Sequence, residues 1–102
     1  MTRRTYRLDA DTRQYLDSSL LHLIVRGSDV VGRYGRYGVI RGTLDGSELT
    51  ASLNDGPNRG WLRASFDAVY DTFEGTCAYG REPANECRIS GSRVEKKRAA
   101  AL

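Results

Sequence analysis

The sequence predicts an all-β protein: a single small antiparallel β-barrel of seven or eight strands in meander order, with or without one short N-terminal helix. Three observations predict this fold. From Leu20 onward, short apolar runs alternate with turn residues at intervals of roughly ten residues, as in sandwiches and barrels. Within each run, apolar side chains recur at every second position, which places them on one face of a strand. Glycines recur on that face in mid-strand, where a small barrel needs sharp bends and has little room for side chains.

Seven consecutive segments carry the alternating pattern. They are residues 20–26, 30–34, 38–44, 48–53, 61–66, 72–79 and 87–94. Because the connections are short, we expect neighbouring strands to pair antiparallel. Asp45 and Gly46 predict a tight hairpin, since glycine adopts positive φ without steric cost.

The N-terminal residues are assigned separately. Residues 3–9 can form an eighth strand with Tyr6 and Leu8 on one face, and Asp9 or Asp11 can begin a short helix. The expected division is an N-terminal strand and/or short helix, an antiparallel barrel, and a basic flexible tail, over residues 1–19, 20–94 and 95–102.

Four residues on the inner face are expected to be structural. Gly42, Gly75 and Gly91 lie in mid-strand, whereas a phosphate-binding glycine lies in a loop that opens a helix. Arg93 shares their face near the end of the barrel. Its guanidinium can reach an aromatic ring or loop carbonyls there, while its stem packs.

Cys77 and Cys87 fall on the inner face of two neighbouring strands. Cross-strand neighbours can approach to the Cα separation that a disulfide needs. In a reducing cytoplasm, two thiols would instead pack as small apolar residues. We favour the two thiols and leave the disulfide open as the alternative.

The charge pattern does not predict a dedicated DNA-binding protein. The chain has 14 Arg and 2 Lys, with a formal net charge of only +3. The basic surplus lies at the two ends of the chain, and the middle is slightly acidic. No apolar run is long enough to cross a bilayer, and no apolar signal core follows Met1. We therefore expect a cytoplasmic protein that does not contact a membrane.

Candidate chemistry is sparse. His22 is the only histidine, and neither it nor the cysteines show the spacing of a metal site. No nucleophile motif such as G-x-S-x-G is present. We expect a protein that is not an enzyme, with no catalytic residue, no metal and no cofactor.

The repeat "RYGRYG" at residues 33–38 is interpreted as a hairpin turn that brings tyrosine and arginine together at one end of the barrel. Tyrosine and arginine are enriched in binding hot spots. The outer face carries further arginines, interrupted by Glu48 and Glu74. The expected partner-binding residues are Arg33, Tyr34, Arg36, Tyr37, Arg41, Arg63 and Arg88.

The chain also resembles the glycine-rich β-meander modules of small bacterial and phage proteins. Their loose pattern is G-x-Y, G-x-I-x-G-x-L, G-x-x-L, F-x-G-x-Y-G and a final W-x-G-T-R-like strand. The matching stretches are Gly32–Tyr34, Gly38–Leu44, Gly46–Leu49, Phe73–Gly80 and Ile89–Arg93, with Ile89 in place of the usual tryptophan. The resemblance covers roughly residues 20–94. It implies a small lipocalin- or avidin-like barrel and no particular activity.

These observations favour a non-enzymatic protein-binding module. An inhibitor encoded by a phage or mobile element, of the anti-CRISPR kind, would act on a larger protein or on a protein–nucleic-acid complex. A barrel that binds a small ligand inside, or a weak nucleic-acid binder, is the alternative. Direct nucleic-acid contact and homo-oligomers are left open.

Overall fold

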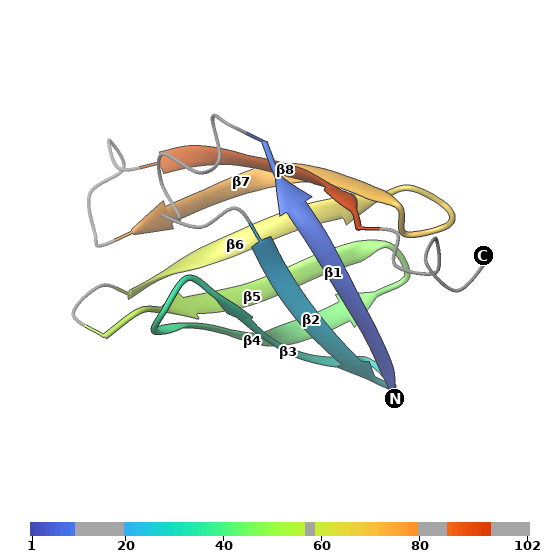
Figure 1. The fold of residues 1–102 in the computed structure, drawn as a ribbon, viewed down its shortest axis with the longest axis horizontal. Helices are drawn as coiled ribbons and strands as arrows, with labels where there is room; N and C mark the ends of the chain where they lie inside the picture. The colour runs from blue at the N-terminus through green and yellow to red at the C-terminus, as the bar shows by residue number, and fades with distance from the viewer. Residues whose placement is uncertain (10–19, 57–58, 80–85, 95–102) are drawn as a thin grey trace, which may run out of the picture.

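Eight antiparallel strands close into one barrel in the computed structural model, which describes residues 1–9, 20–56, 59–79 and 86–94 (Figure 1). The strands are β1 (Thr2–Leu8), β2 (Leu20–Arg26), β3 (Asp29–Tyr34), β4 (Gly38–Asp45), β5 (Glu48–Asn54), β6 (Arg59–Phe66), β7 (Thr72–Tyr79) and β8 (Glu86–Arg93). Their order in the barrel is their order in the chain. The predicted all-β meander barrel is confirmed, with eight strands and no helix in the described ranges. The expected helix near the N-terminus and the basic tail fall on residues outside those ranges.

The first strand belongs to the barrel and closes it. On one side β1 pairs with β2, and on the other Tyr6, Arg7 and Leu8 pair with the end of β8. The amide of Val94 donates a hydrogen bond of 2.8 Å to the carbonyl oxygen of Thr5, which extends this closure. The barrel therefore begins at Thr2, and the eighth strand that was expected as an option over residues 3–9 is part of it.

The inner faces of the strands form one apolar core. Burial alternates along the strands, as in β5, where every second residue is buried. Tyr6, Phe66 and Phe73 pack ring against ring, with centroids 5.2 to 5.5 Å apart. Ile40 and Leu62 are fully buried in the same cluster. The described inward side chains thus fill the interior with one another.

Tyrosine hydroxyls find partners at the two ends of this core. The hydroxyls of Tyr34 and Tyr79 lie 2.8 Å apart, and the hydroxyl of Tyr6 donates to the carbonyl oxygen of Tyr70 at 2.7 Å. Burial raises the pKa of Tyr6 to about 12 and also raises the pKa values of Tyr34 and Tyr79. The phenols are therefore neutral at ordinary pH and hold the ends of the barrel by hydrogen bonds.

The inward glycines lie where neighbouring strands approach closely. A Cβ atom at Gly42 would lie 2.1 Å from the carbonyl oxygen of Thr50, and one at Gly75 would lie 1.9 Å from that of Arg63. At Gly91 the same atom would meet the ring of Phe73 at 2.9 Å. At Gly42 and Gly75 the blocking atoms belong to the neighbouring backbone, so no side chain fits there without moving a strand. At Gly91 the ring of Phe73 would have to shift.

Cys77 and Cys87 form a disulfide bond, so the preference for two free thiols is wrong. The two residues are direct cross-strand partners in β7 and β8, with Cα atoms 5.0 Å apart. The antiparallel register brings the side chains together on the inner face, where both are buried. A bond that closes so short a loop stabilises a fold by about 3 kcal/mol.

The ion pair of Arg93 differs from both contacts that we expected as alternatives, an aromatic ring or loop carbonyls. The guanidinium of Arg93 lies 3.7 Å from the carboxylate of Asp71, and its side chain is 42% exposed. Arg4 occupies the aromatic position instead, with its guanidinium 4.5 Å from the ring centroid of Tyr70. Arg93 is the final residue of β8 and lies at the open end of the barrel. Its side chain therefore reaches the carboxylate of Asp71, in the loop between β6 and β7, rather than a ring.

Candidate binding surface

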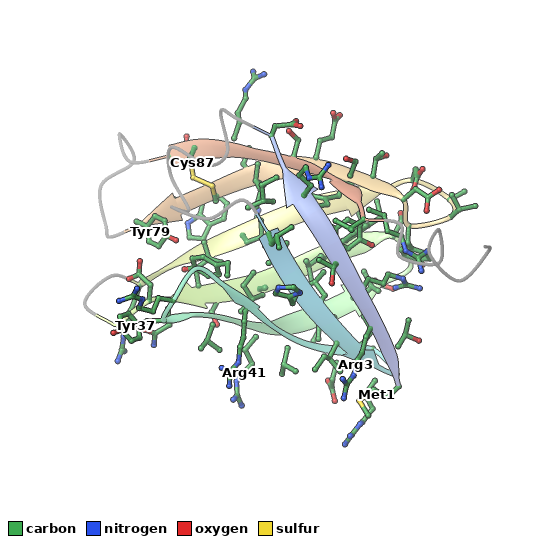
Figure 2. The ribbon with its side chains drawn as sticks, viewed as in Figure 1. Met1, Arg3, Tyr37, Arg41, Tyr79 and Cys87 are labelled. Atoms are coloured by element: carbon green, nitrogen blue, oxygen red, sulfur yellow. A yellow bond between two sulfur atoms is a disulfide. The ribbon has the colours of Figure 1, made fainter. Side chains whose placement is uncertain are left out.

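Of the two tyrosines in "RYGRYG", Tyr34 is buried and Tyr37 is exposed. Gly35 has a φ of 64°, which lets the chain reverse between β3 and β4. Tyr37 is 73% exposed at the tip, and Arg36 is exposed beside it. Figure 2 shows Tyr37 at the margin of the barrel, far from its interior. Tyr37 and Arg36 are thus accessible, as a binding turn requires.

Tyr34 is not accessible, and its expected role as a partner anchor is corrected. Its side chain is only 2% exposed and its ring packs inside, against the backbone of Gly38. The reason is strand phase: Tyr34 shares the inward phase of Val30 and Gly32 along β3. Composition alone had suggested a hot spot, but the alternation of the strand places this ring in the core.

Exposed arginines gather on the outer surface of β3 to β8. We call this set the arginine wall: Arg33, Arg41, Arg59, Arg63 and Arg88. A row is here the line of residues that pair with one another across neighbouring strands. Arg33 and Arg59 lie in one row, Arg41 in the next, and Arg63 and Arg88 in the third. Arg41 points outward from the barrel in Figure 2. Four strands, β3, β4, β6 and β8, therefore contribute arginines to one basic surface beside the turn that follows Arg33.

The glutamates that seemed to interrupt this surface lie outside it. Glu48 and Glu74 are in the next row, on either side of Ser65, toward the β4–β5 turn. They belong to a group that we call the acidic end: Asp9, Asp45, Glu48, Asp67, Asp71 and Glu74. Among the described residues in the three arginine rows, only Asp29 and Glu86 are acidic. The three rows are thus mainly basic, and most of the described carboxylates lie beyond them at the acidic end.

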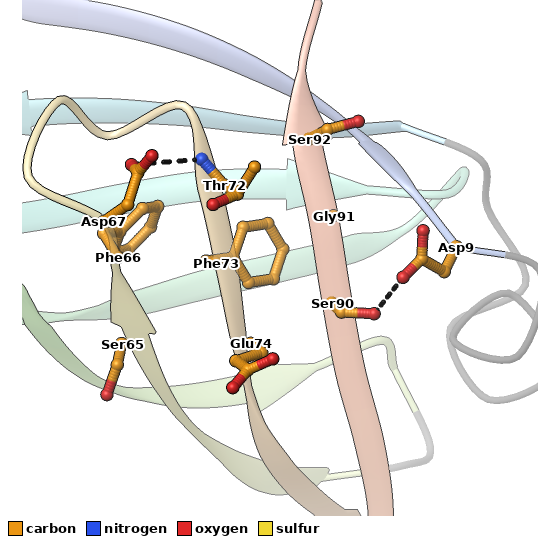
Figure 3. Close-up of a pocket in the computed structure, with 10 residues that line it drawn as sticks. All are labelled: Asp9, Ser65, Phe66, Asp67, Thr72, Phe73, Glu74, Ser90, Gly91 and Ser92. Atoms are coloured by element: carbon orange, nitrogen blue, oxygen red, sulfur yellow. Dashed lines mark hydrogen bonds between the residues drawn. The ribbon is translucent and has the colours of Figure 1, made fainter.

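The acidic end contains an open pocket, but its carboxylates serve the local structure (Figure 3). Asp67 accepts hydrogen bonds from the amides of Asp71 and Thr72, which fixes the β6–β7 loop. Asp9 accepts a hydrogen bond from the hydroxyl of Ser90. Within the described ranges no group of three or more His, Cys, Asp or Glu residues could hold a metal ion. Asp9 and Asp67 of this pocket therefore hold its surrounding segments together by hydrogen bonds.

His22 lies on the outer face of β2, exposed. Its Nδ1 atom is 3.0 Å from the hydroxyl oxygen of Thr5, its cross-strand partner.

No described helix is long and apolar enough to cross a membrane.

Trp61 is the residue of this surface that the sequence analysis did not select. It lies on the outer face of β6, 37% exposed, and the guanidinium of Arg63 is 5.6 Å from its ring centroid. Two further apolar residues of the outer face, Val31 and Val39, are 39% and 40% exposed. The alternation of side chains along the strand indicates the outward position of Trp61, because the next residue, Leu62, points inward. A lone outward tryptophan beside arginines is a binding signal in itself.

Comparisons with known proteins do not assign this chain to a family. No protein-family model matches it, and neither a curated protein nor a solved structure matches it. The resemblance to glycine-rich meander modules stays a prediction from the motifs.

Proposed function

We propose that the protein is a non-catalytic binding module that holds an anionic surface of a larger protein or protein–nucleic-acid complex. The arginine wall and the exposed turn residues Arg36 and Tyr37 would make the contact. The observation that supports this proposal is the uneven charge of the outer surface, with five arginines in three adjacent rows that contain only two described acidic residues, Asp29 and Glu86. The biological role that we propose is inhibition of a host nucleic-acid-handling complex in the cytoplasm, by a protein from a phage or mobile element.

The chemistry of these side chains suits recognition of anions. A guanidinium is always charged and presents a planar set of donors that matches carboxylate and phosphate groups. A surface of one sign also speeds the encounter with an oppositely charged partner. Tyr37 adds an aromatic ring at the margin of the wall, where it can anchor a neighbouring contact.

The packing of the barrel supports an outer rather than an inner binding surface. The inward side chains of Ile40, Leu53 and Leu62 are at most 1% exposed and belong to the same cluster as the aromatic rings. A small-ligand barrel would instead need an internal space bordered by a few polar groups.

Reversing two charges of the arginine wall tests this proposal. Arg33→Glu with Arg41→Glu places two carboxylates at neighbouring positions of the wall, so we expect repulsion of an anionic partner. The double variant should capture at least roughly tenfold less of the partner that the wild-type protein retains from a lysate of the source cells. Quantitative affinity capture, with and without nuclease treatment, measures the difference.

The matched control is Arg3→Glu with Arg7→Glu on β1. These residues are also exposed and outward, and the change in net charge is the same. Arg3 continues the row of Arg41 but lies three strands away from it, on β1. The control should retain the partner. If both double variants lose it equally, net charge alone governs capture and the wall has no special role.

A further inference from the structure

We infer that Trp61 and the arginines around it form a binding site for single-stranded nucleic acid on the outer surface of β4, β5 and β6. This inference rests on the proposed function and names the anionic partner of the arginine wall. It depends on three features: the setting of the tryptophan, the charge of its neighbours and the small size of the side chains beside it.

Trp61 lies in the middle of β6 between two outward arginines of the same strand. Arg59 and Arg63 are two positions away on either side, so all three side chains emerge from the same face. The guanidinium of Arg63 lies within cation–π distance of the ring. This contact holds the ring at the surface without removing it from solvent.

The cross-strand neighbours of Trp61 are short. Ser52 of β5 pairs with it on one side, and Ala78 of β7 on the other. Beyond Ser52 in the same row lies Arg41, whose carbonyl oxygen accepts the hydroxyl of Ser52 at 3.2 Å. Ala78 is buried and Ser52 is exposed, so a flat base can approach the exposed part of the tryptophan ring from the side of Ser52.

The combination of residues favours an unpaired strand over other anions. Aromatic rings stack on bases of any sequence, and arginines bind the phosphates that join them. A duplex keeps its bases stacked on each other, so it offers no free base to Trp61. An acidic peptide would use the arginines but gain little from the tryptophan.

Fluorescence anisotropy with a fluorescein-labelled oligothymidine of about ten nucleotides tests the inference. The intact protein should bind it at low salt, with quenching of the intrinsic fluorescence of Trp61, the only tryptophan. Trp61→Ala should weaken binding at least about fivefold, the lower range for loss of one stacked base. Trp61→Phe should restore most of the affinity, and Val39→Ala, which shortens another exposed apolar residue, should bind like the wild type.

Salt dependence gives a second measurement that does not depend on how the Trp61 variants fold. If Arg41, Arg59 and Arg63 contact phosphates, the slope of log K against log salt should be about −2, and Arg59→Ala should reduce its magnitude by about 0.7. The inference is overturned if the wild-type protein does not bind the oligonucleotide, if Trp61→Ala binds equally well, or if a duplex of the same length binds as tightly.

Failure of this inference differs from failure of the proposed function. When the oligonucleotide does not bind but the Arg33/Arg41 reversal still releases a nuclease-resistant partner, the wall binds a protein and only the nucleic-acid inference is wrong. When the reversal also has no effect, the proposed function is wrong as well.

Discussion

Leu62→Ala is expected to lower the free energy of unfolding by about 2–5 kcal/mol, the range for truncation of a buried leucine. Leu62 is fully buried in the middle of β6, where it lies between Ala51 of β5 and Cys77 of β7. Its neighbours are held by the strand ladders and by the disulfide, so they cannot collapse into the space that the side chain leaves. Because small domains have about 5–15 kcal/mol of stability in total, the loss would be a large fraction.

Denaturant unfolding followed by circular dichroism measures this loss. The matched control is Thr50→Ala, an exposed outward residue of β5, which should change stability by less than about 0.5 kcal/mol. Equal losses at the two positions would mean that the inner and outer faces are assigned incorrectly.

Gly75→Ala is expected to be the most damaging of the small substitutions, with a loss of at least about 3 kcal/mol or failure to fold. The added Cβ would lie 1.9 Å from the carbonyl oxygen of Arg63 and 2.6 Å from the Cα atom of Ala64. Both atoms belong to the backbone of β6, so no side-chain rotation relieves the clash. The two strands would have to separate, which weakens the hydrogen bonds between them.

Gly27→Ala provides the comparison, because it adds the same atom in a different setting. Gly27 has a φ of 62° and no atom within 4 Å of an added Cβ, so its substitution carries only the conformational cost of about 1–2 kcal/mol. Thermal unfolding of both variants measures the difference in their stability. A Gly75→Ala protein as stable as Gly27→Ala would contradict the close approach of β6 and β7.

Alternation of side chains predicted much of the fold. Period two assigned Leu49, Ala51 and Leu53 to one face of a strand, and these residues are buried together. Leu44 shares the inward phase of Ile40 along β4, but it is only partly buried because it lies beside the turn that follows β4. Alternation thus predicts which face of the strand a side chain occupies, but it does not predict how completely that side chain is buried.

Register was harder to predict, because the geometry of each connecting turn sets it, and a row across the barrel combines several such registers. The pairing that forms the Cys77–Cys87 disulfide and the rows that separate Glu48 from the arginine wall both come from the register. Alternation predicts the outward position of Arg41, but it does not predict which residues of the neighbouring strands pair with it. The selection of Tyr34 as an anchor failed for another reason: the composition of the turn was weighed above the phase of the strand.

The most direct test of the account is a ¹H–¹⁵N correlation spectrum of the protein during titration with single-stranded oligothymidine. The central claim is that binding occurs on the outer arginine wall and leaves the packed interior unchanged. The indole N–H of Trp61 gives a unique signal, since the chain has one tryptophan. We expect the largest shifts at that indole and at the amides of Ser52 and Arg63, with little change at Leu49 or Phe73. Shifts that concentrate at the acidic end or inside the barrel, with the indole unmoved, would contradict the account.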